Sequence, residues 1–96
     1  MKISFENNSG NFALSLEGRL DTTTAPELEA FLNDNINQMG TLTIDCEKLE
    51  YVSSAGLRTF LMAQKILKSK LKLVKVQELV MEVFEITGFA DILEIE

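Results

Sequence analysis

The chain has no histidine and no tryptophan, and it has one cysteine, one proline and one tyrosine. Without histidine a Ser-His-Asp triad cannot form, and a serine nucleophile lacks its usual base. The ligands typical of a zinc site are missing too, so we expect no metal and no cofactor. Cys46 has no partner for an internal disulfide, and its place at the end of an apolar run predicts a small buried side chain. These absences argue against an enzyme.

Long apolar runs and an excess of basic residues are missing as well. No run approaches the roughly 18 residues that span a bilayer, and the N-terminus lacks the apolar core of a signal peptide. The net charge of −6 disfavours nucleic acid and predicts protein partners with a neutral or basic surface. We therefore expect a single domain over residues 1–96, located in the cytoplasm, with no membrane partner. A monomer is expected, although the oligomeric state is left open.

Hydrophobic periodicity predicts an α/β fold. Alternation over Lys2–Glu6 and from Phe12 to about Leu20 predicts two strands, and the turn cluster Asn7–Gly10 makes them a hairpin. The later expected elements are a helix from Thr24 to about Met39, a strand over Thr41–Asp45, a loop over Glu47–Ser53, a helix over Leu57–Ser69, a strand over Lys70–Val76 and a helix over Glu78–Thr87. The element order β-β-α-β-α-β-α indicates one sheet covered by helices.

Several boundaries carry their own expectations. Thr24–Glu27 has the spacing of a capping box, and Gly40 and Gly88 are placed to end the helices before them. In the last helix, the residues expected to face inward are Leu79, Val80, Val83 and Phe84. The segment 89–96 is expected to form either a short edge strand or a further helical turn.

Ser53 and Ser54 stand where a strand gives way to a helix. A helix N-terminus offers unpaired N–H groups and a positive dipole end, which suit a phosphate that is bound or attached to serine. Capping is the simplest role and is expected for one of the two serines. The run from Ser54 to Gly56 matches half of a nucleophile elbow, but Val52 occupies the position of the first glycine. An acyl-transfer enzyme is therefore not favoured.

The helix after the serines has two faces. The face that we expect to be exposed contains Ser54, Arg58, Met62 and Lys65, at spacings of four, four and three. The apolar face contains Leu57, Phe60, Leu61 and Leu67. The first face is either an ordinary solvated surface or a docking surface with Met62 as its apolar contact.

Gly56 and Asp21 are two further candidates. Glycine costs about 1 kcal/mol relative to alanine inside a helix, so Gly56 predicts close approach of another backbone, a partner or the first helix. Asp21, followed by Thr22 and Thr23, leaves the end of the second expected strand. Because such strand ends meet at one edge of a sheet, we expect the Asp21 loop and the Ser54 turn to be neighbours. Taken alone, Asp21 is more simply a turn or cap residue.

Two segments resemble a known family. Leu16–Thr22 with Ala25–Leu28, and Tyr51–Leu61, are similar to the STAS domain of bacterial anti-sigma-factor antagonists, and the likeness covers essentially the whole chain. It implies a STAS-like single mixed sheet of four to five strands covered by three or more helices. It also implies that the chain binds an anti-sigma factor that is a serine kinase and so frees a sigma factor. Phosphorylation of a serine at the start of the second helix then ends the complex, and a phosphatase restores it.

The family motif Asp-Ser-Ser/Thr-Gly-Leu assigns roles to the serine turn. Ser53 takes the position of the aspartate, Ser54 that of the phosphate acceptor and Ala55 that of the second hydroxyl, while Gly56 and Leu57 match. The resemblance thus implies phosphorylation of Ser54. Ser53 is the alternative site, because a hydroxyl replaces the aspartate there.

The resemblance also places Asp21 at the family's aspartate before the first helix. Together with the exposed face of the helix, this gives the expected partner-binding residues: Asp21, Thr22, Thr23, Ser53, Ser54, Gly56, Arg58, Met62 and Lys65. Two other readings stay open: a non-phosphorylated STAS-like protein-interaction module of another signalling pathway, in which the serines only cap the helix, and a small enzyme or nucleotide-binding protein. No Walker-type loop supports the last of these.

Overall fold

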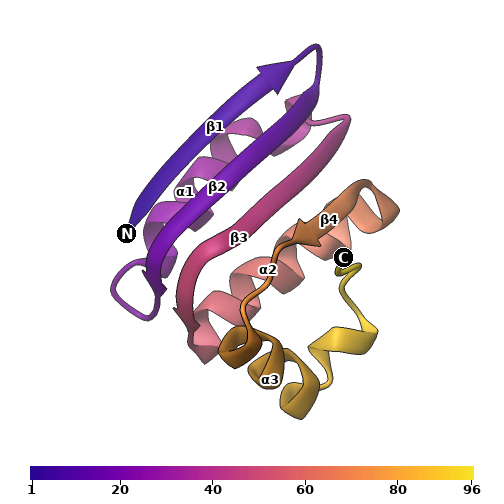
Figure 1. Cartoon of the computed structure of the whole chain (residues 1–96). Helices are drawn as coiled ribbons and strands as arrows, with labels where there is room; N and C mark the ends of the chain where they lie inside the picture. The colour runs from indigo at the N-terminus through magenta and orange to yellow at the C-terminus, as the bar shows by residue number, and fades with distance from the viewer.

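One mixed sheet organises the chain (Figure 1), and the computed structural model describes all of residues 1–96. Its four strands lie in the order β1-β2-β3-β4, with β1 antiparallel to β2 and the other pairs parallel. In chain order the elements are β1 (Lys2–Asn8), β2 (Asn11–Leu20), α1 (Ala25–Asn35), the 3₁₀ turn η1 (Ile36–Gln38), β3 (Thr41–Val52), α2 (Ser54–Leu67), η2 (Lys68–Lys70), β4 (Leu71–Val74), α3 (Glu78–Thr87) and η3 (Phe89–Asp91). The predicted fold class is confirmed.

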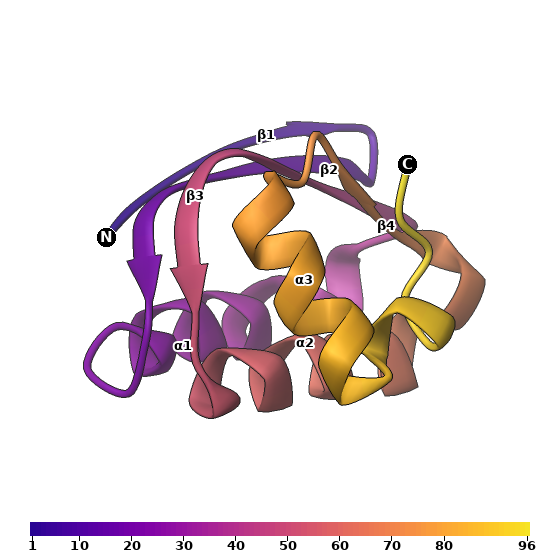
Figure 2. The ribbon, with the colours of Figure 1, turned by 60° about the horizontal axis from the view of Figure 1, so that its bottom comes forward.

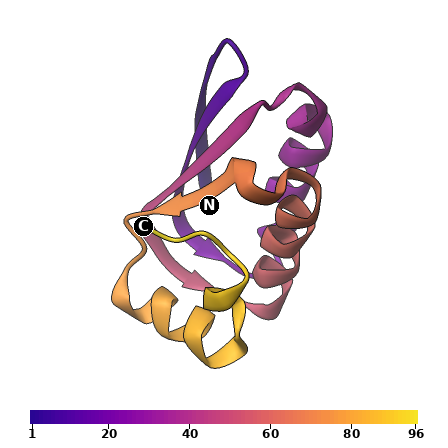
Figure 3. The same ribbon diagram turned by 90° about the vertical axis from the view of Figure 1, so that its right-hand side faces the viewer.

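The helices lie on one side of the sheet. Figure 2 shows α1 and α2 side by side beneath the strands, with α3 next to α2 under the curved part of β3. Figure 3 shows that no helix covers the opposite face. The core lies between the two layers and includes Leu14, Leu16, Leu28, Leu32, Leu42, Ile44 and Phe60, all fully buried. Each such side chain stabilises the fold by roughly 1.5–3 kcal/mol, which fixes both helices on the sheet.

The hairpin turn between β1 and β2 explains why the end of α1 was predicted wrongly. Ser9 and Gly10 have φ values of 57° and 93°, as a two-residue hairpin turn requires. The Gly10 carbonyl accepts from the Gly40 N–H at 2.7 Å and the Thr41 N–H at 3.2 Å. Gly40 is therefore not the residue that ends α1, because α1 stops at Asn35 and Gly40 instead ties the start of β3 to the hairpin.

β3 is longer than predicted, and the expected Glu47–Ser53 loop is wrong. The strand continues to Val52 and stays paired with β2 across two bulges. Its buried residues beyond the middle are Cys46, Leu49 and Val52, at intervals of three rather than two. Bulges insert extra residues and bend a strand, so the pattern loses the alternation by which strands are recognised.

Cys46 is buried within β3, as predicted. Burial raises the pKa of its thiol to about 12, and the charge of the neighbouring Asp45 acts in the same direction. The thiol is thus a protonated core group at neutral pH.

The second half of the chain differs from prediction at four places. α2 starts at Ser54, one turn before the predicted Leu57, and ends at Leu67, because Lys68 adopts a φ of 54°. β4 is confined to Leu71–Val74. α3 and its left-handed Gly88 stop are confirmed. Leu79, however, is 67% exposed, since α3 buries only the narrow stripe of Val80 and Phe84.

The C-terminal segment combines both alternatives. It forms the turn η3 and then a single parallel bridge between Leu73 and Ile95 at the β4 edge. None of the helices is long and apolar enough to cross a membrane.

Candidate functional site

The Asp21 loop and the serine turn follow adjacent strands. Leu20 at the end of β2 pairs with Val52 at the end of β3. The Ser53 N–H donates to the Leu20 carbonyl at 2.9 Å, which ties one turn to the other. The predicted proximity of Asp21 and Ser54 is confirmed by this arrangement.

Asp21 is bonded to the backbone of its own loop. Asp21 Oδ1 accepts from the N–H groups of Thr23 and Thr24 at 3.0 and 3.1 Å. The Thr24 N–H holds the pKa of the Asp21 carboxyl below its usual value of 3.8; burial opposes this, whereas Thr23, the Thr24 hydroxyl and Arg19 act with it. The simple turn role of Asp21 is confirmed, and the carboxylate is ionised at neutral pH.

The predicted capping box at the start of α1 is absent. Thr24 occupies the N-cap but makes no side-chain cap bond. Its hydroxyl turns back instead, accepting from the Asp21 N–H at 2.9 Å and donating to the Arg19 carbonyl at 2.7 Å. The hydroxyl is thus used to close the loop rather than to cap the helix.

Arg19 and Tyr51 were missed by the sequence analysis. They are cross-strand partners on β2 and β3, and the guanidinium carbon lies 4.2 Å from the centre of the Tyr51 ring. Arg19 Nε also lies 3.9 Å from Asp21 Oδ2. The pairing depends on the second bulge between the strands, which no spacing in the sequence reveals.

The two serines have different roles. Ser53 is the N-cap of α2, and its hydroxyl accepts from the Gly56 N–H at 3.5 Å. Ser54 is the first residue of the helix, and its exposed hydroxyl makes no hydrogen bond within the chain. The expectation that one serine caps the helix is confirmed for Ser53, and the Ser54 hydroxyl is left without a partner in the chain.

Gly56 is required by packing. A Cβ atom there would lie 2.7 Å from Leu20 Cγ and 2.8 Å from Val52 Cγ2, closer than real contacts allow. The closest neighbours are thus side chains at the two strand ends, and not α1 or another backbone. Because Gly56 is buried, any influence on a partner is through the position of α2.

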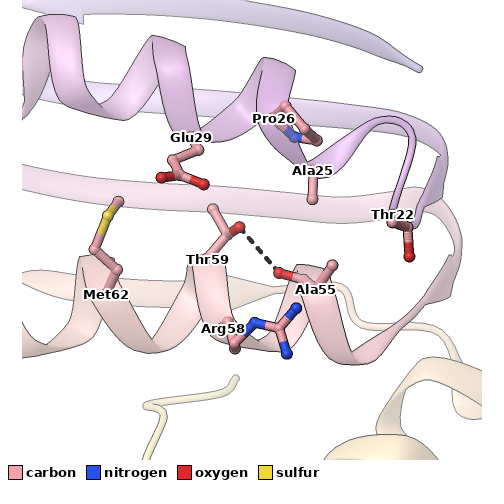
Figure 4. Close-up of a pocket in the computed structure, with 8 residues that line it drawn as sticks. All are labelled: Thr22, Ala25, Pro26, Glu29, Ala55, Arg58, Thr59 and Met62. Atoms are coloured by element: carbon pink, nitrogen blue, oxygen red, sulfur yellow. Dashed lines mark hydrogen bonds between the residues drawn. The ribbon is translucent and has the colours of Figure 1, made fainter.

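A groove runs between α1 and α2 beside the serine turn (Figure 4). Its volume is about 400 Å³, and its lining residues are Thr22, Ala25, Pro26, Glu29, Ala55, Arg58, Thr59 and Met62. The Thr59 hydroxyl is used within α2, since it donates to the Ala55 carbonyl at 3.1 Å. The groove brings Thr22 together with Arg58 and Met62 of the α2 stripe, whereas Ser54 and Lys65 do not line it. Thr23 is exposed in the loop and does not line the groove either.

A second hollow of about 420 Å³ continues along the outer side of α2. Its lining residues are Arg58, Leu61, Met62, Lys65 and Ile66. Leu61 was expected to lie on the buried face but is only half-buried, and Ile66 is 54% exposed. The exposed stripe predicted for α2 is confirmed for Ser54, Arg58 and Lys65, whereas Met62 is half-buried against the core. The stripe also borders Leu61 and Ile66, which the prediction did not include in it.

A family model described as "Mlab, STAS domain" matches residues 3–94. The chain belongs to the STAS-domain family of anti-sigma-factor antagonists. This STAS domain is 34% identical to BtrV of Bordetella bronchiseptica over 96% of the chain and 83% of the relative. It is 33% identical to the anti-sigma-B factor antagonist of Listeria monocytogenes over 100% of the chain and 90% of the relative.

Solved structures share the fold of this STAS domain. An anti-sigma factor antagonist from Mycobacterium paratuberculosis superimposes with a TM-score of 0.86 at 22% identity, over 98% of the chain and 83% of the other protein. The antagonist SpoIIAA in its unphosphorylated form gives a TM-score of 0.77 at 18% identity, over 99% of the chain and 87% of the other.

Proposed function

We propose that this STAS domain is an anti-sigma-factor antagonist that binds an anti-sigma factor and thereby frees a sigma factor. The binding surface comprises the Asp21–Thr23 loop, the serine turn and the exposed stripe of α2. The partner is a serine kinase, and it ends the complex by phosphorylating Ser54. A phosphatase restores the unmodified chain, and the cycle takes place in the cytoplasm.

The free hydroxyl of Ser54 carries this proposal. It is exposed beside the groove and is not used by the fold, whereas Ser53 is half-buried and engaged as the helix cap. A kinase can therefore reach Ser54 without opening α2. The chain supplies the accepting hydroxyl and the partner supplies the catalytic groups, so the chain itself is not the enzyme.

The local electrostatics suit a phosphate switch. Phosphorylation adds about −1.5 to −2 charges, which a helix N-terminus tolerates because of its free N–H groups and positive dipole end. The modified chain should therefore stay folded while its binding surface changes in charge and bulk. The relatives named as antagonists support the partner class, and SpoIIAA, a protein of the same fold, has been solved in a phosphorylated form.

The test uses the serine-kinase anti-sigma factor encoded in the same genome. The native chain, Ser54→Ala and Ser53→Ala are each incubated with this kinase and ATP, and intact masses are measured with fragmentation. We expect one phosphate on Ser54 in the native chain and in Ser53→Ala, and none in Ser54→Ala. A phosphate that persists in Ser54→Ala would assign the switch to Ser53.

A second candidate function is a constitutive interaction module. It is favoured by the hydroxyl at position 53, where the family motif has an aspartate beside the acceptor. Stable complex formation with no phosphate on any variant would select this function, and both serines would then be structural.

A further inference from the structure

Charge is strongly segregated along this acidic chain. Residues 51–77, which run from the end of β3 through α2 and β4, contain six of the nine cationic residues and none of the fifteen acidic ones. The net charge of −6 conceals this block, because the acidic residues lie elsewhere in the chain. A partner that meets α2 therefore encounters a surface of opposite sign to the protein as a whole.

Only part of this cationic block is neutralised within the fold. Lys72 pairs with Glu96 at 2.9 Å, and Lys75 lies 3.9 Å from Asp45 and 3.8 Å from Glu47. Arg58 and Lys65 on α2 make no ion pair. The free cations of the helix thus project from its exposed stripe.

These cations frame an apolar hollow. Arg58 and Lys65 line the outer hollow of α2 together with Leu61, Met62 and Ile66. The lining runs from Arg58 to Ile66, an interval of about 12 Å of helix. A segment of about two helical turns, with apolar residues on one side and carboxylates at its margins, matches this length and pattern.

We propose that α2 docks an acidic amphipathic helix of the anti-sigma factor in this hollow. The apolar side of that helix covers Leu61, Met62 and Ile66, and its carboxylates pair with Arg58 and Lys65. This inference rests on the proposed function, because it names the part of the partner that the α2 stripe recognises.

An anionic membrane would be attracted by the same two cations, but the rest of the molecule opposes it. The net charge is −6, and α1 beside the groove contributes Glu27, Glu29 and Asp34. A flat anionic surface would bring these carboxylates close to like charge, whereas a single helix contacts only the hollow.

The same docking mode explains how phosphorylation would act. Arg58 is one turn after Ser54, at the spacing at which a phosphate and a guanidinium on one helix interact. A phosphate on Ser54 would draw Arg58 away from the partner and repel the carboxylates of the docked helix. Release would follow from the loss of charge complementarity, with no change in the fold.

The test measures the affinity of the native chain and its variants for the anti-sigma factor by calorimetry. Lys65→Glu should weaken binding by about tenfold or more, and Ile66→Ser by a similar factor, because each removes one component of the hollow. Lys70→Glu is the matched control, since it makes the same charge change outside the hollow and should bind like the native chain. A photo-crosslinker at residue 66 should attach to an acidic amphipathic segment of the partner.

Ser54→Asp distinguishes this proposal from the proposed function. If Ser54→Asp releases the partner while Lys65→Glu and Ile66→Ser bind normally, the docking proposal is overturned and the switch stands. If Lys65→Glu weakens binding while Ser54→Asp does not, docking is supported and the switch fails. Attachment of the crosslinker to a segment without acidic residues overturns the docked helix. The docked helix is also overturned if the native chain binds phosphatidylglycerol vesicles and Lys65→Glu loses this binding while its affinity for the anti-sigma factor is unchanged.

Discussion

The two helices that cover the sheet begin in different ways, although both follow the carboxyl end of a parallel strand. The turn before α1 is closed on itself, because Asp21 and Thr24 bind each other and the neighbouring backbone. The turn before α2 is shorter, is capped by Ser53 through one long hydrogen bond, and leaves the Ser54 hydroxyl free.

Under the proposed function, this difference assigns a structural role to the first turn and the phosphorylation site to the second. A loop that is closed by several internal hydrogen bonds holds its shape, so the Asp21 loop is suited to present a fixed surface. A free hydroxyl on the first residue of a rigid helix can be modified at little cost to the fold. The four substitutions below test whether stability and partner binding divide between the two turns in this way, and they are ordered by their expected effect on stability.

Gly56→Ala should destabilise the protein most. Its Cβ atom would lie within 2.9 Å of Leu20 and Val52, and such overpacking typically costs about 1–3 kcal/mol. Urea unfolding should show a lower midpoint with an unchanged slope. Alanine regains about 1 kcal/mol of helix propensity at this position, which offsets part of the loss. Ala55→Gly measures that contribution in the same turn without the clash. An unchanged midpoint in Gly56→Ala would show that the clash costs no more than the gain in propensity.

Asp21→Asn should destabilise the closed turn in a pH-dependent manner. The folded pKa of Asp21 is lowered, so its charge contributes stability above the ordinary value of 3.8, and this contribution is lost as the pH falls through the lower folded pKa. Melting temperatures should therefore differ between Asp21→Asn and the native chain at pH 7, and the difference should shrink as the pH falls below 3.8 and through the lower folded pKa. A difference that is constant with pH would mean that the ionised carboxylate is not what stabilises the loop.

Ser53→Ala should cost about 0.5–1 kcal/mol, at the lower end for a helix cap, because the bond to the Gly56 N–H is 3.5 Å long. Chemical denaturation measures this loss directly. Ser53→Asp is the matched variant, since aspartate also caps and should recover the stability. Equal losses in both would indicate that the hydroxyl does not act as a cap.

Ser54→Asp should leave the melting temperature unchanged or slightly raised, because an acidic residue in the first helical turn is stabilising by a few tenths of a kcal/mol up to about 1 kcal/mol. The same variant should lose the anti-sigma factor in a pull-down, whereas Ser54→Ala should retain it. A marked fall in melting temperature would refute a surface switch at this residue.

Much of the fold could be predicted from local patterns. The first hairpin follows from alternation and the Ser9-Gly10 turn, and α3 follows from its helical period and the Gly88 stop. The error in β3 arose where pairing across bulges replaced alternation with a period of three. The end of α1 was misplaced because the Gly40 N–H is bonded to the distant Gly10.

The candidate site was also predictable only in part. Helical spacing was enough to group Ser54 with Arg58, and strand ends were enough to bring Asp21 near them. Spacing could not show which of Ser53 and Ser54 caps α2 and which has a free hydroxyl, because that depends on which residue adopts the cap geometry. It could not find the stacking of Arg19 on Tyr51 either, since that contact depends on the register across a bulge.

The sequence alone determined the order of the elements, the absence of histidine-based catalysis and the block of cations over residues 51–77, because these depend on composition and short-range period. The tertiary structure decided which side chains are free to act. It buried Gly56 against two strand ends, engaged Ser53 in the cap and left Ser54, Lys65 and Ile66 exposed. The physical reason is that exposure and pairing are set by contacts between segments far apart in the chain, which local periodicity does not contain.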